Sequence, residues 1–245
     1  MKIIVIIQAR MGSTRLPGKV LLPLGSSSIL NYVVQRCHKI NHVEQVIVAT
    51  STDERDDRIA EWCESHQVSY YRGSEDDVLA RYYECAVQYD PDYVIRVTSD
   101  CPFLDFDLAN YTIEQMRQQP VDVIVNKQQE QLTRGLAVEL ISFAALQRIY
   151  KHSTAPRHRE HVTYYAYEYI SEFKHLTIEL PDQILKPDIR LTVDTPEDYE
   201  VCRILADQLE DSINRPAADF IAHIINHPDI GHINAHIKQK PVLDE

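Results

Sequence analysis

The chain has 245 residues, 37 of them acidic and 25 basic, and its net charge is −12. An acidic surface repels nucleic acid and anionic membranes, so neither is expected as a partner. No run approaches 18 consecutive apolar residues, and the five cysteines form no C-x-x-C pair. These features argue against membrane insertion, a disulfide framework and a zinc ribbon, and they predict a single domain, residues 1–245, in the cytoplasm.

The first predicted element is a strand over residues 3–7, an unbroken β-branched run that suits a strand buried on both faces. The loop that follows, residues 8–19, holds Arg10, Arg15 and Lys19 with two glycines, a proline and two small hydroxyl residues. Residues 1–43 contain six cations and no acid, so they carry +6 and the other 202 residues carry −18. This composition predicts a site for a small polyanion such as a phosphate chain. The alternative is a basic turn that caps a helix.

The loop does not match two common phosphate-binding motifs. The spacing from Gly12 to Gly18 is one residue too long for G-x-x-x-x-G-K-[ST], and Val20 replaces the metal-binding hydroxyl. The same glycines lack the short spacing of G-x-G-x-x-G. The loop instead resembles the signature A-R-x-G-S-x-R-L-P-G-K of the cytidylyltransferases that activate acidic sugars, and within them the family of spore-coat polysaccharide biosynthesis protein F.

This resemblance implies an α/β fold of the nucleotide-diphospho-sugar transferase type, a Rossmann-like GT-A architecture with three layers and a mostly parallel sheet. It also implies that the loop wraps the triphosphate of CTP, with Arg15 and Lys19 as catalytic residues at the β- and γ-phosphates. The nucleotide-binding residues that the resemblance transfers within the loop are Ala9, Arg10, Gly12, Ser13, Arg15 and Lys19.

Strands and helices then alternate along the chain. Apolar residues at helical spacing predict a helix over residues 29–40, with residues 26–28 as candidate caps. A strand at 45–50, a helix over 51–63 and a short strand at 68–71 follow. This alternation predicts a mostly parallel sheet with helices on both faces.

Residues 72–79, R-G-S-E-D-D-V-L, lie at a predicted turn from strand to helix. Ser74 is a candidate N-cap, and the three acids after it complement a helix N-terminus. The segment also resembles one of the same family, which implies that Arg72 and Ser74 contact the base or ribose of the nucleotide. Capping and nucleoside contact both stay open at this point.

Asp100 follows a buried strand predicted at 93–98 and is the first catalytic candidate among the acids. The next two predicted elements are a helix and a strand, at 105–118 and 121–126. Asp105 and Asp107 form a D-x-D, the metal motif of many glycosyltransferases. They stand at the start of the predicted helix, however, where aspartates cap by default.

The pattern changes over residues 127–185, which predicts a small β-containing insertion in the domain. Residues 134–140 are strand-like, and a helix begins near Ser142. We expect this insertion to hold the acceptor and to pair two subunits into a homodimer.

Within the insertion the family has a P-D-G-L-D-V-E-V type segment, which Gly135 and Glu139 match and Thr133, Arg134 and Ala137 do not. The resemblance implies that Gly135 and Glu139 bind the acceptor, while the departures leave acceptor specificity open. Arg159 begins an R-E-H-V-T that the family also has, which implies a place near the acceptor or in the dimer contact. The start of a surface helix is the alternative.

Residues 176–180 and 189–193 alternate as strands should. The second run leads to Asp194, Thr195 and Pro196, where threonine is a candidate helix cap and proline takes the first helical position. Asp194 itself stands before the cap and is therefore free for another role.

The segment V-D-T-P-E-D around Asp194 resembles the second metal motif of the family, and the resemblance implies that Asp100 and Asp194 bind one Mg²⁺. Mg²⁺ prefers one or two protein carboxylates together with substrate phosphates. Two carboxylates brought close together repel in the free protein, so a cation is expected between them.

The chain ends in helices predicted over residues 213–245. His223 and His227 fall at i,i+4 spacing, as do His232 and His236, but turn residues separate the two pairs and no H-E-x-x-H is present. Exposed helix faces or a subunit contact are expected there rather than a zinc site.

The resemblance therefore implies a Mg²⁺-dependent cytidylyltransferase that forms a CMP-activated sugar from CTP and an acidic or phosphorylated sugar, with release of pyrophosphate, for surface polysaccharide. Two alternatives stay open. One is a metal-dependent GT-A-type glycosyltransferase that uses Asp105 and Asp107. The other is a non-catalytic nucleotide-binding partner of a polysaccharide enzyme, which the alanine at position 137 would favour.

Overall fold

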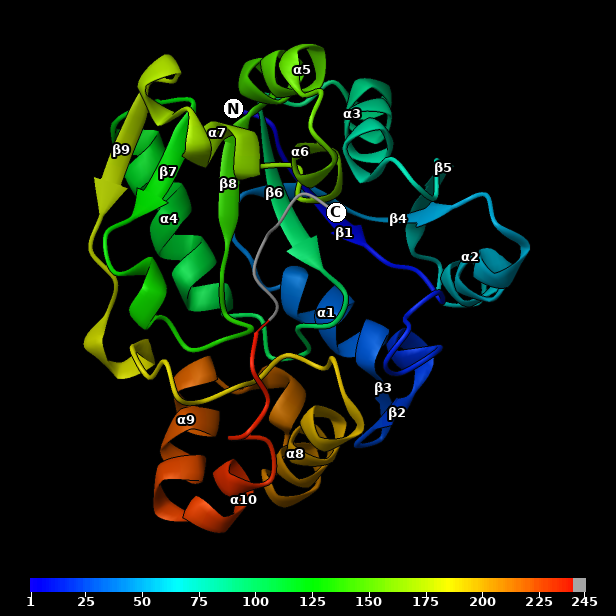
Figure 1. Cartoon of the computed structure of the whole chain (residues 1–245), viewed down its shortest axis with the longest axis vertical. Coiled ribbons are helices and arrows are strands. Elements are labelled where there is room, and N and C mark those ends of the chain that lie inside the picture. Colours follow the sequence, from blue (N-terminus) through cyan, green and yellow to red (C-terminus); the bar gives the residue numbers. More distant parts are fainter. Residues whose placement is uncertain (240–245) are drawn as a thin grey trace.

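Four parallel strands form the half of the central sheet that leads into the basic loop (Figure 1). The structure is a computed structural model and describes residues 1–239. The strands lie in the order β5 (Ser69–Gly73), β4 (Val43–Ser51), β1 (Ile3–Gln8) and β6 (Tyr93–Thr98). Because neighbours pair in parallel, their carboxyl ends meet at one edge of the sheet. The four strands predicted from the sequence are confirmed, each to within two residues.

Three further strands extend the sheet beyond β6. β8 (Glu139–Ser142) lies antiparallel between β6 and β7 (Val123–Asn126), and β9 (His175–Ile178) pairs in parallel with β7 at the edge. Residues 127–185 thus contribute β8 and β9 to the central sheet itself. A small hairpin, β2 (Pro23–Leu24) with β3 (Ser27–Ser28), stands apart from it. The predicted mostly parallel sheet with a β-containing insertion is confirmed.

Two predicted strands are wrong in whole or in part. Residues 134–138 and 189–193 are loops that touch at a single bridge between Arg134 and Arg190. The chain turns at Gly135, whose φ is 98°, so a strand cannot continue there. The alternation at 189–193 has another cause, because Leu191 and Val193 are fully buried against the core from a loop.

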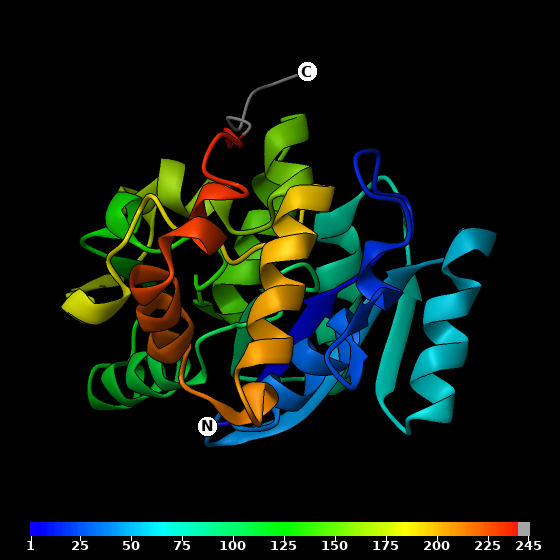
Figure 2. The same cartoon turned by 90° about the horizontal axis from the view of Figure 1, so that it is seen from below.

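Helices cover both faces of the sheet, as predicted. Along β1, Ile3, Val5 and Ile7 pack into one apolar layer, while Ile4 and Ile6 pack into the other. The first layer includes residues of α1 (Ile29–Cys37), α2 (Asp57–Ser65), α4 (Phe106–Gln118), α8 (Pro196–Gln208), α9 (Ala217–Asn226) and α10 (Pro228–His232). The second includes residues of α3 (Val78–Tyr89), α5 (Phe143–His152) and α7 (Tyr164–Glu168). Figure 2, seen from below, shows α8 and α9 in front of the sheet.

Several helices of the described chain start with a side-chain N-cap. Ser28, Ser142 and Thr195 each accept a hydrogen bond from the backbone N–H three residues on, as expected of N-caps. The prediction of Ser74 as a cap is wrong. β5 extends through Gly73, so α3 starts later and Asp77 caps it, while the Ser74 hydroxyl accepts from the Asp77 N–H.

The described helices include none with the length and apolar character needed to cross a bilayer. Of the predicted C-terminal helices, α9 and α10 are present, and residues 240–245 lie outside the described part. His223 stacks on His227 and contacts the Gln208 amide oxygen at 2.8 Å. These histidines are helix-surface groups with ordinary neighbours.

Candidate active site

The loop of residues 8–19 begins where β1 ends and is anchored by an acid that sequence reasoning missed. Asp56, only 2% exposed, accepts a hydrogen bond from the Met11 N–H at 2.7 Å and others from the N–H and hydroxyl of Ser51. The loop closes on itself where the Gly18 N–H donates to the Met11 carbonyl, with Gly18 at a φ of 69°. Asp56 stood among other acids, so no pattern in the sequence distinguished it.

Lys19 brings the two predicted metal-binding aspartates together. Its Nζ lies 3.0 Å from Asp100 Oδ2 and 3.1 Å from Asp194 Oδ1, and it donates to the Val193 carbonyl at 2.6 Å. The two acids are far apart in sequence, but the backbone of Val193 donates to the Asp100 carbonyl and joins their segments. The turn after β6 and the segment before α8 therefore meet at the end of the basic loop.

The charges in this cluster stabilise one another. Burial acts to raise the pKa of Asp100, but the Lys19 ammonium and hydrogen bonds from neighbouring groups hold that pKa below its usual value. Burial likewise acts to lower the pKa of Lys19, but Asp100 and Asp194 raise it. Lys19 therefore lies between the two carboxylates and offsets the repulsion predicted for them in the free protein.

Two arginines complete the cluster around Asp194. Arg15 lies 3.3 Å from Asp194 Oδ1, and Arg190 lies 3.5 Å from its Oδ2. Arg190 also forms a two-pronged ion pair with Asp198, which is fully buried. Arg190 was missed in the sequence, because its only visible role there was as part of a predicted strand.

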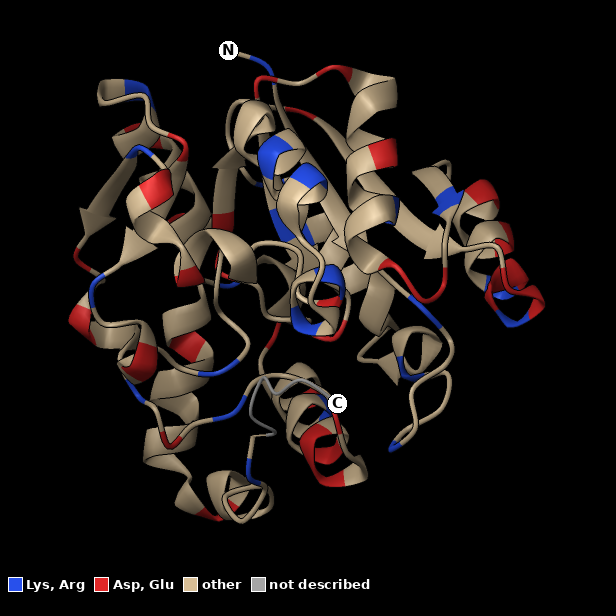
Figure 3. Ribbon diagram, turned by 45° about the horizontal axis from the view of Figure 1, so that its top comes forward, with Lys and Arg blue, Asp and Glu red and all other residues tan. Residues whose placement is uncertain are grey.

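The third cation of the loop, Arg10, pairs with Glu160 at 3.4 Å. Each loop cation therefore has an acidic partner from a distant segment. Acidic positions outnumber basic ones along α2 and α8 (Figure 3). The positive charge of the loop is thus partly neutralised by these acids. A phosphate chain that binds there would compete with them for the loop cations or share those cations with them.

Arg72 and Ser74 lie at the carboxyl end of β5, beside the loop. The Arg72 side chain donates to the carbonyls of Ser51 and Asp53 and pairs with Asp57. The neighbouring Glu75 pairs with Arg55 at 2.6 Å, and an added Cβ at Gly12 would lie 3.5 Å from each of those two side chains. The segment at 72–75 and the loop therefore border the same space.

The three predicted acceptor-binding residues each have a structural role in the fold. Glu139 pairs with Arg96 at 2.6 Å and accepts from Thr163. Arg159 pairs with Asp77, the cap of α3. A Cβ at Gly135 would lie 2.7–2.8 Å from backbone atoms of Leu191 and Thr192, so this position admits only glycine without a shift.

The donor set at Asp100 and Asp194 suits Mg²⁺, since both side chains keep some exposure, 27% and 15%, and both are carboxylates. Within residues 1–239 no three His, Cys, Asp or Glu side chains gather into a metal site. Asp105 is buried and caps α4, accepting from the N–H groups of Asp107 and Leu108. The first aspartate of the D-x-D is therefore an N-cap, and this gives the glycosyltransferase alternative no support.

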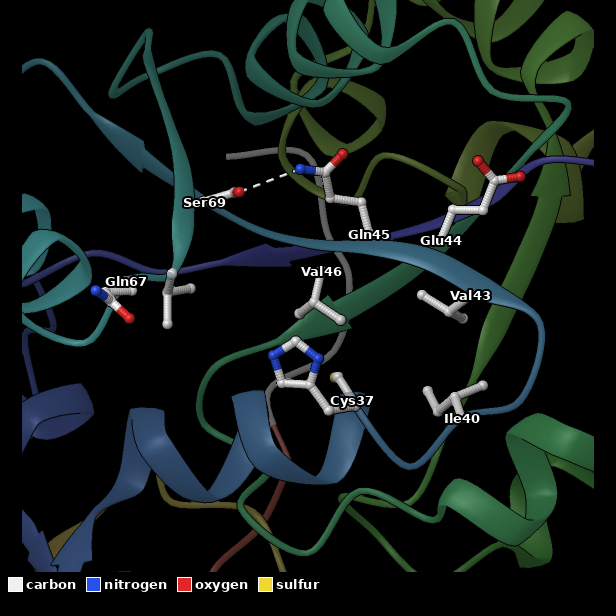
Figure 4. Close-up of a pocket in the computed structure, with 10 residues that line it drawn as sticks. Cys37, Ile40, Val43, Glu44, Gln45, Val46, Gln67 and Ser69 are labelled. Atoms are coloured by element: carbon white, nitrogen blue, oxygen red, sulfur yellow. Dashed lines mark hydrogen bonds between the residues drawn. The ribbon is translucent and has the colours of Figure 1, made fainter.

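A cavity of about 240 Å³ lies at the opposite edge of the sheet, where β4 and β5 begin (Figure 4). Glu44 is among its lining residues, none of which is a lysine or arginine, and Gln45 donates to the Ser69 hydroxyl there at 3.2 Å. A polyanion would find no cation in it. The loop edge is therefore the candidate active site.

A basic loop at the carboxyl ends of parallel strands, with Lys19 between two aspartates, is typical of the α/β proteins that bind nucleotide phosphates. The profile of the cytidylyltransferase family matches residues 4–216, so this chain belongs to the cytidylyltransferase family. An uncharacterized protein of Methanocaldococcus jannaschii is 37% identical over 240 residues, which span 98% of this chain and 97% of that relative.

Spore coat polysaccharide biosynthesis protein SpsF of Bacillus subtilis (strain 168) is 33% identical over 237 residues, which span 93% of this chain and 95% of that protein. A cytidylyltransferase structure from Leptospira borgpetersenii serovar Hardjo-bovis (strain JB197) superposes with a TM-score of 0.88 and 31% identity. It covers 98% of this chain and all of the other. The resemblance drawn from the loop and the predicted fold class are both confirmed.

Proposed function

We propose that this protein transfers the cytidylyl group of CTP to an acidic or phosphorylated sugar, giving a CMP-activated sugar and pyrophosphate for surface polysaccharide. The observation that carries the proposal is the contact of Lys19, at the end of the basic loop, with both Asp100 and Asp194. Membership of the cytidylyltransferase family and the likeness to a spore-coat polysaccharide protein support it.

In this proposal the loop binds the triphosphate. The Gly12 backbone N–H, the Ser13 hydroxyl and Arg10 contact phosphate oxygens, and Ala9 lies at the strand end beside them. Arg15 and Lys19 bind the β- and γ-phosphates, arginine as a two-pronged donor and lysine as a point charge. Arg72 and Ser74 face the nucleoside from the end of β5. The loop cations would stabilise the charge that develops on the pyrophosphate as it leaves.

In this reaction the protein mainly positions the two substrates and stabilises charge. A hydroxyl oxygen of the sugar forms a bond to the α-phosphorus of CTP, the bond from that phosphorus to the bridging oxygen breaks, and the hydroxyl proton leaves to solvent. Asp100 and Asp194 would hold Mg²⁺, which when bound supplies charge neutralisation at the α-phosphate. The acceptor lies on the side of Gly135, Glu139 and Arg159.

A pyrophosphate-release assay tests the function. Purified protein is incubated with CTP, Mg²⁺ and a panel of sugars that carry a carboxylate, a phosphate or neither, and we expect release only with acidic members. Binding of CTP without turnover on any member would instead favour the non-catalytic alternative. ATP, GTP and UTP in place of CTP are the controls for base selectivity.

We further propose a homodimer in the cytoplasm. β9 is an edge strand of the sheet within residues 127–185, and an unpaired edge can add a second chain. All five cysteines are free thiols in the structure, as suits a reducing compartment. Light scattering at micromolar concentration that gave the mass of one chain would remove the dimer and leave the catalytic proposal intact.

A further inference from the structure

A second cavity, of about 380 Å³, adjoins the aspartate cluster. Three segments line it, which lie far apart in the sequence: Arg134, Pro187, Asp188, Arg190, Ala235, Ile237 and Gln239. Arg190 belongs to both places, because it lines the cavity and lies 3.5 Å from Asp194 Oδ2. A molecule in this cavity would therefore sit next to the proposed site of phosphate chemistry.

Two arginines and one aspartate are the charged side chains in the part of the lining that the structure describes. Arg190 is 94% buried and committed to Asp194 and Asp198, with its other side bonded to Gln239 at 3.3 Å. Arg134 is exposed and, among residues 1–239, makes no hydrogen bond or ion pair through its side chain. Asp188 is the one carboxylate among the described residues of the lining. Within residues 1–239, the guanidinium of Arg134 is thus the uncommitted cation of the lining and the group that can bind a ligand.

The backbone holds Arg134 in place beside the active-site segment. Its N–H donates to the Ile189 carbonyl at 3.1 Å, and its carbonyl accepts from the Leu191 N–H at 2.8 Å. Gly135 permits this approach, since a side chain there would overlap the backbone at Leu191. The segment from Leu191 continues to Asp194, so the position of Arg134 relative to the aspartates is set by the main chain.

We propose that this cavity receives the acceptor sugar and that Arg134 binds its anionic group, a carboxylate or a phosphate. This inference rests on the proposed function. A planar guanidinium matches either anion with two parallel hydrogen bonds. The triphosphate has its own cations in the basic loop, so Arg134 is a specificity residue for the acceptor and contributes nothing to CTP binding.

The test compares three variants in the pyrophosphate assay: Arg134→Ala, Arg134→Lys and, as a matched control, Arg58→Ala, an exposed arginine on α2. Loss of the arginine should raise the KM for the acidic acceptor about 10- to 100-fold, as for loss of a hydrogen bond to a charged group. The KM for CTP should change less than about twofold, Arg134→Lys should recover part of the loss, and the control should match wild type.

Paired acceptors show whether the bound anion is a carboxylate or a phosphate. The KM of a hexuronate and the KM of a hexose phosphate are each compared with the KM of the corresponding neutral hexose. Wild type should prefer one of the two acidic sugars over its neutral hexose, and Arg134→Ala should lose that preference. The anionic group of that sugar is the group that Arg134 binds. An unchanged acceptor KM, or an equal rise in the KM for CTP, would overturn the proposal. If wild type releases no pyrophosphate with any sugar, the proposed function fails first, and this inference fails with it.

Discussion

The basic loop and the segment at Arg134 both present cations at the same edge of the sheet, but they do so in opposite ways. In the loop, Arg10, Arg15 and Lys19 each pair with an acid from a distant segment, and Lys19 is 91% buried. Arg134 is exposed and unpaired within the described residues. The difference suggests that internal acids hold the loop cations in place for a highly charged ligand. Arg134, which has no such partner among the described residues, suits an anion of lower charge.

The strongest test of this preassembly removes one acid. Asp100→Asn or Asp194→Asn should lower turnover by about two orders of magnitude or more, the loss typical for one charge-stabilising group. Because Lys19 keeps one of its two carboxylate partners, the free energy of unfolding should fall by only about 1 kcal/mol. Pyrophosphate release and thermal denaturation measure the two effects.

Excess Mg²⁺ should restore part of the activity of either asparagine variant. Wild-type rates in either one, or full activity of the wild type in EDTA, would disprove that these aspartates bind a required metal.

Removing the central cation should have the next largest effect. Lys19→Ala should weaken CTP binding by ~1.5–3 kcal/mol, the range for hydrogen bonds to charged groups, and scarcely affect CMP. It also removes the ammonium partner of Asp100, whereas Asp194 keeps Arg15 and Arg190. Calorimetric titration with both nucleotides measures the difference, and an equal loss for CMP would place Lys19 near the nucleoside or in the fold alone.

The anchor of the loop comes third. Asp56→Ala removes the acceptor for the Met11 N–H and for the Ser51 hydroxyl, so a buried N–H is left without its partner. We expect a loss of about 1–3 kcal/mol in unfolding free energy and weaker CTP binding. Glu61→Ala, an exposed acid on α2, is the control in urea denaturation; equal stability of the two variants would show that Asp56 is not an anchor.

The smallest effect is the pH dependence of stability. The pKa of Asp100 is lowered in the folded state, so its contribution is present above its usual value of 3.8 and is lost as pH falls through the folded pKa. The pKa of Lys19 is raised, so its contribution is complete below 10.5 and is lost at higher pH. In urea denaturation from pH 3 upward, the free energy of unfolding of Asp100→Asn should fall less steeply toward acid pH than that of wild type. An equally steep fall would contradict the pairing of Asp100 with Lys19.

Much of this protein could be predicted from local patterns. The β-branched run of β1, the N-caps at Ser28, Ser142 and Thr195, and the loop signature all depend on residues near one another in sequence. Such features can be predicted from the sequence because helix capping and strand burial depend on residues that lie close together along the chain. Even Asp100 and Asp194 could be singled out, since each follows an apolar run.

Only the tertiary structure decided how the charges pair. Lys19 contacts acids 81 and 175 residues away, Asp56 anchors Met11 across 45 residues, and Arg190 joins the cluster from a loop that looked like a strand. Short-range patterns carry no information about such partners, because electrostatic and hydrogen-bond contacts depend on distance in space. That distance is set by the order of strands in the sheet, which brings the end of β1, the end of β6 and the segment before α8 to one edge.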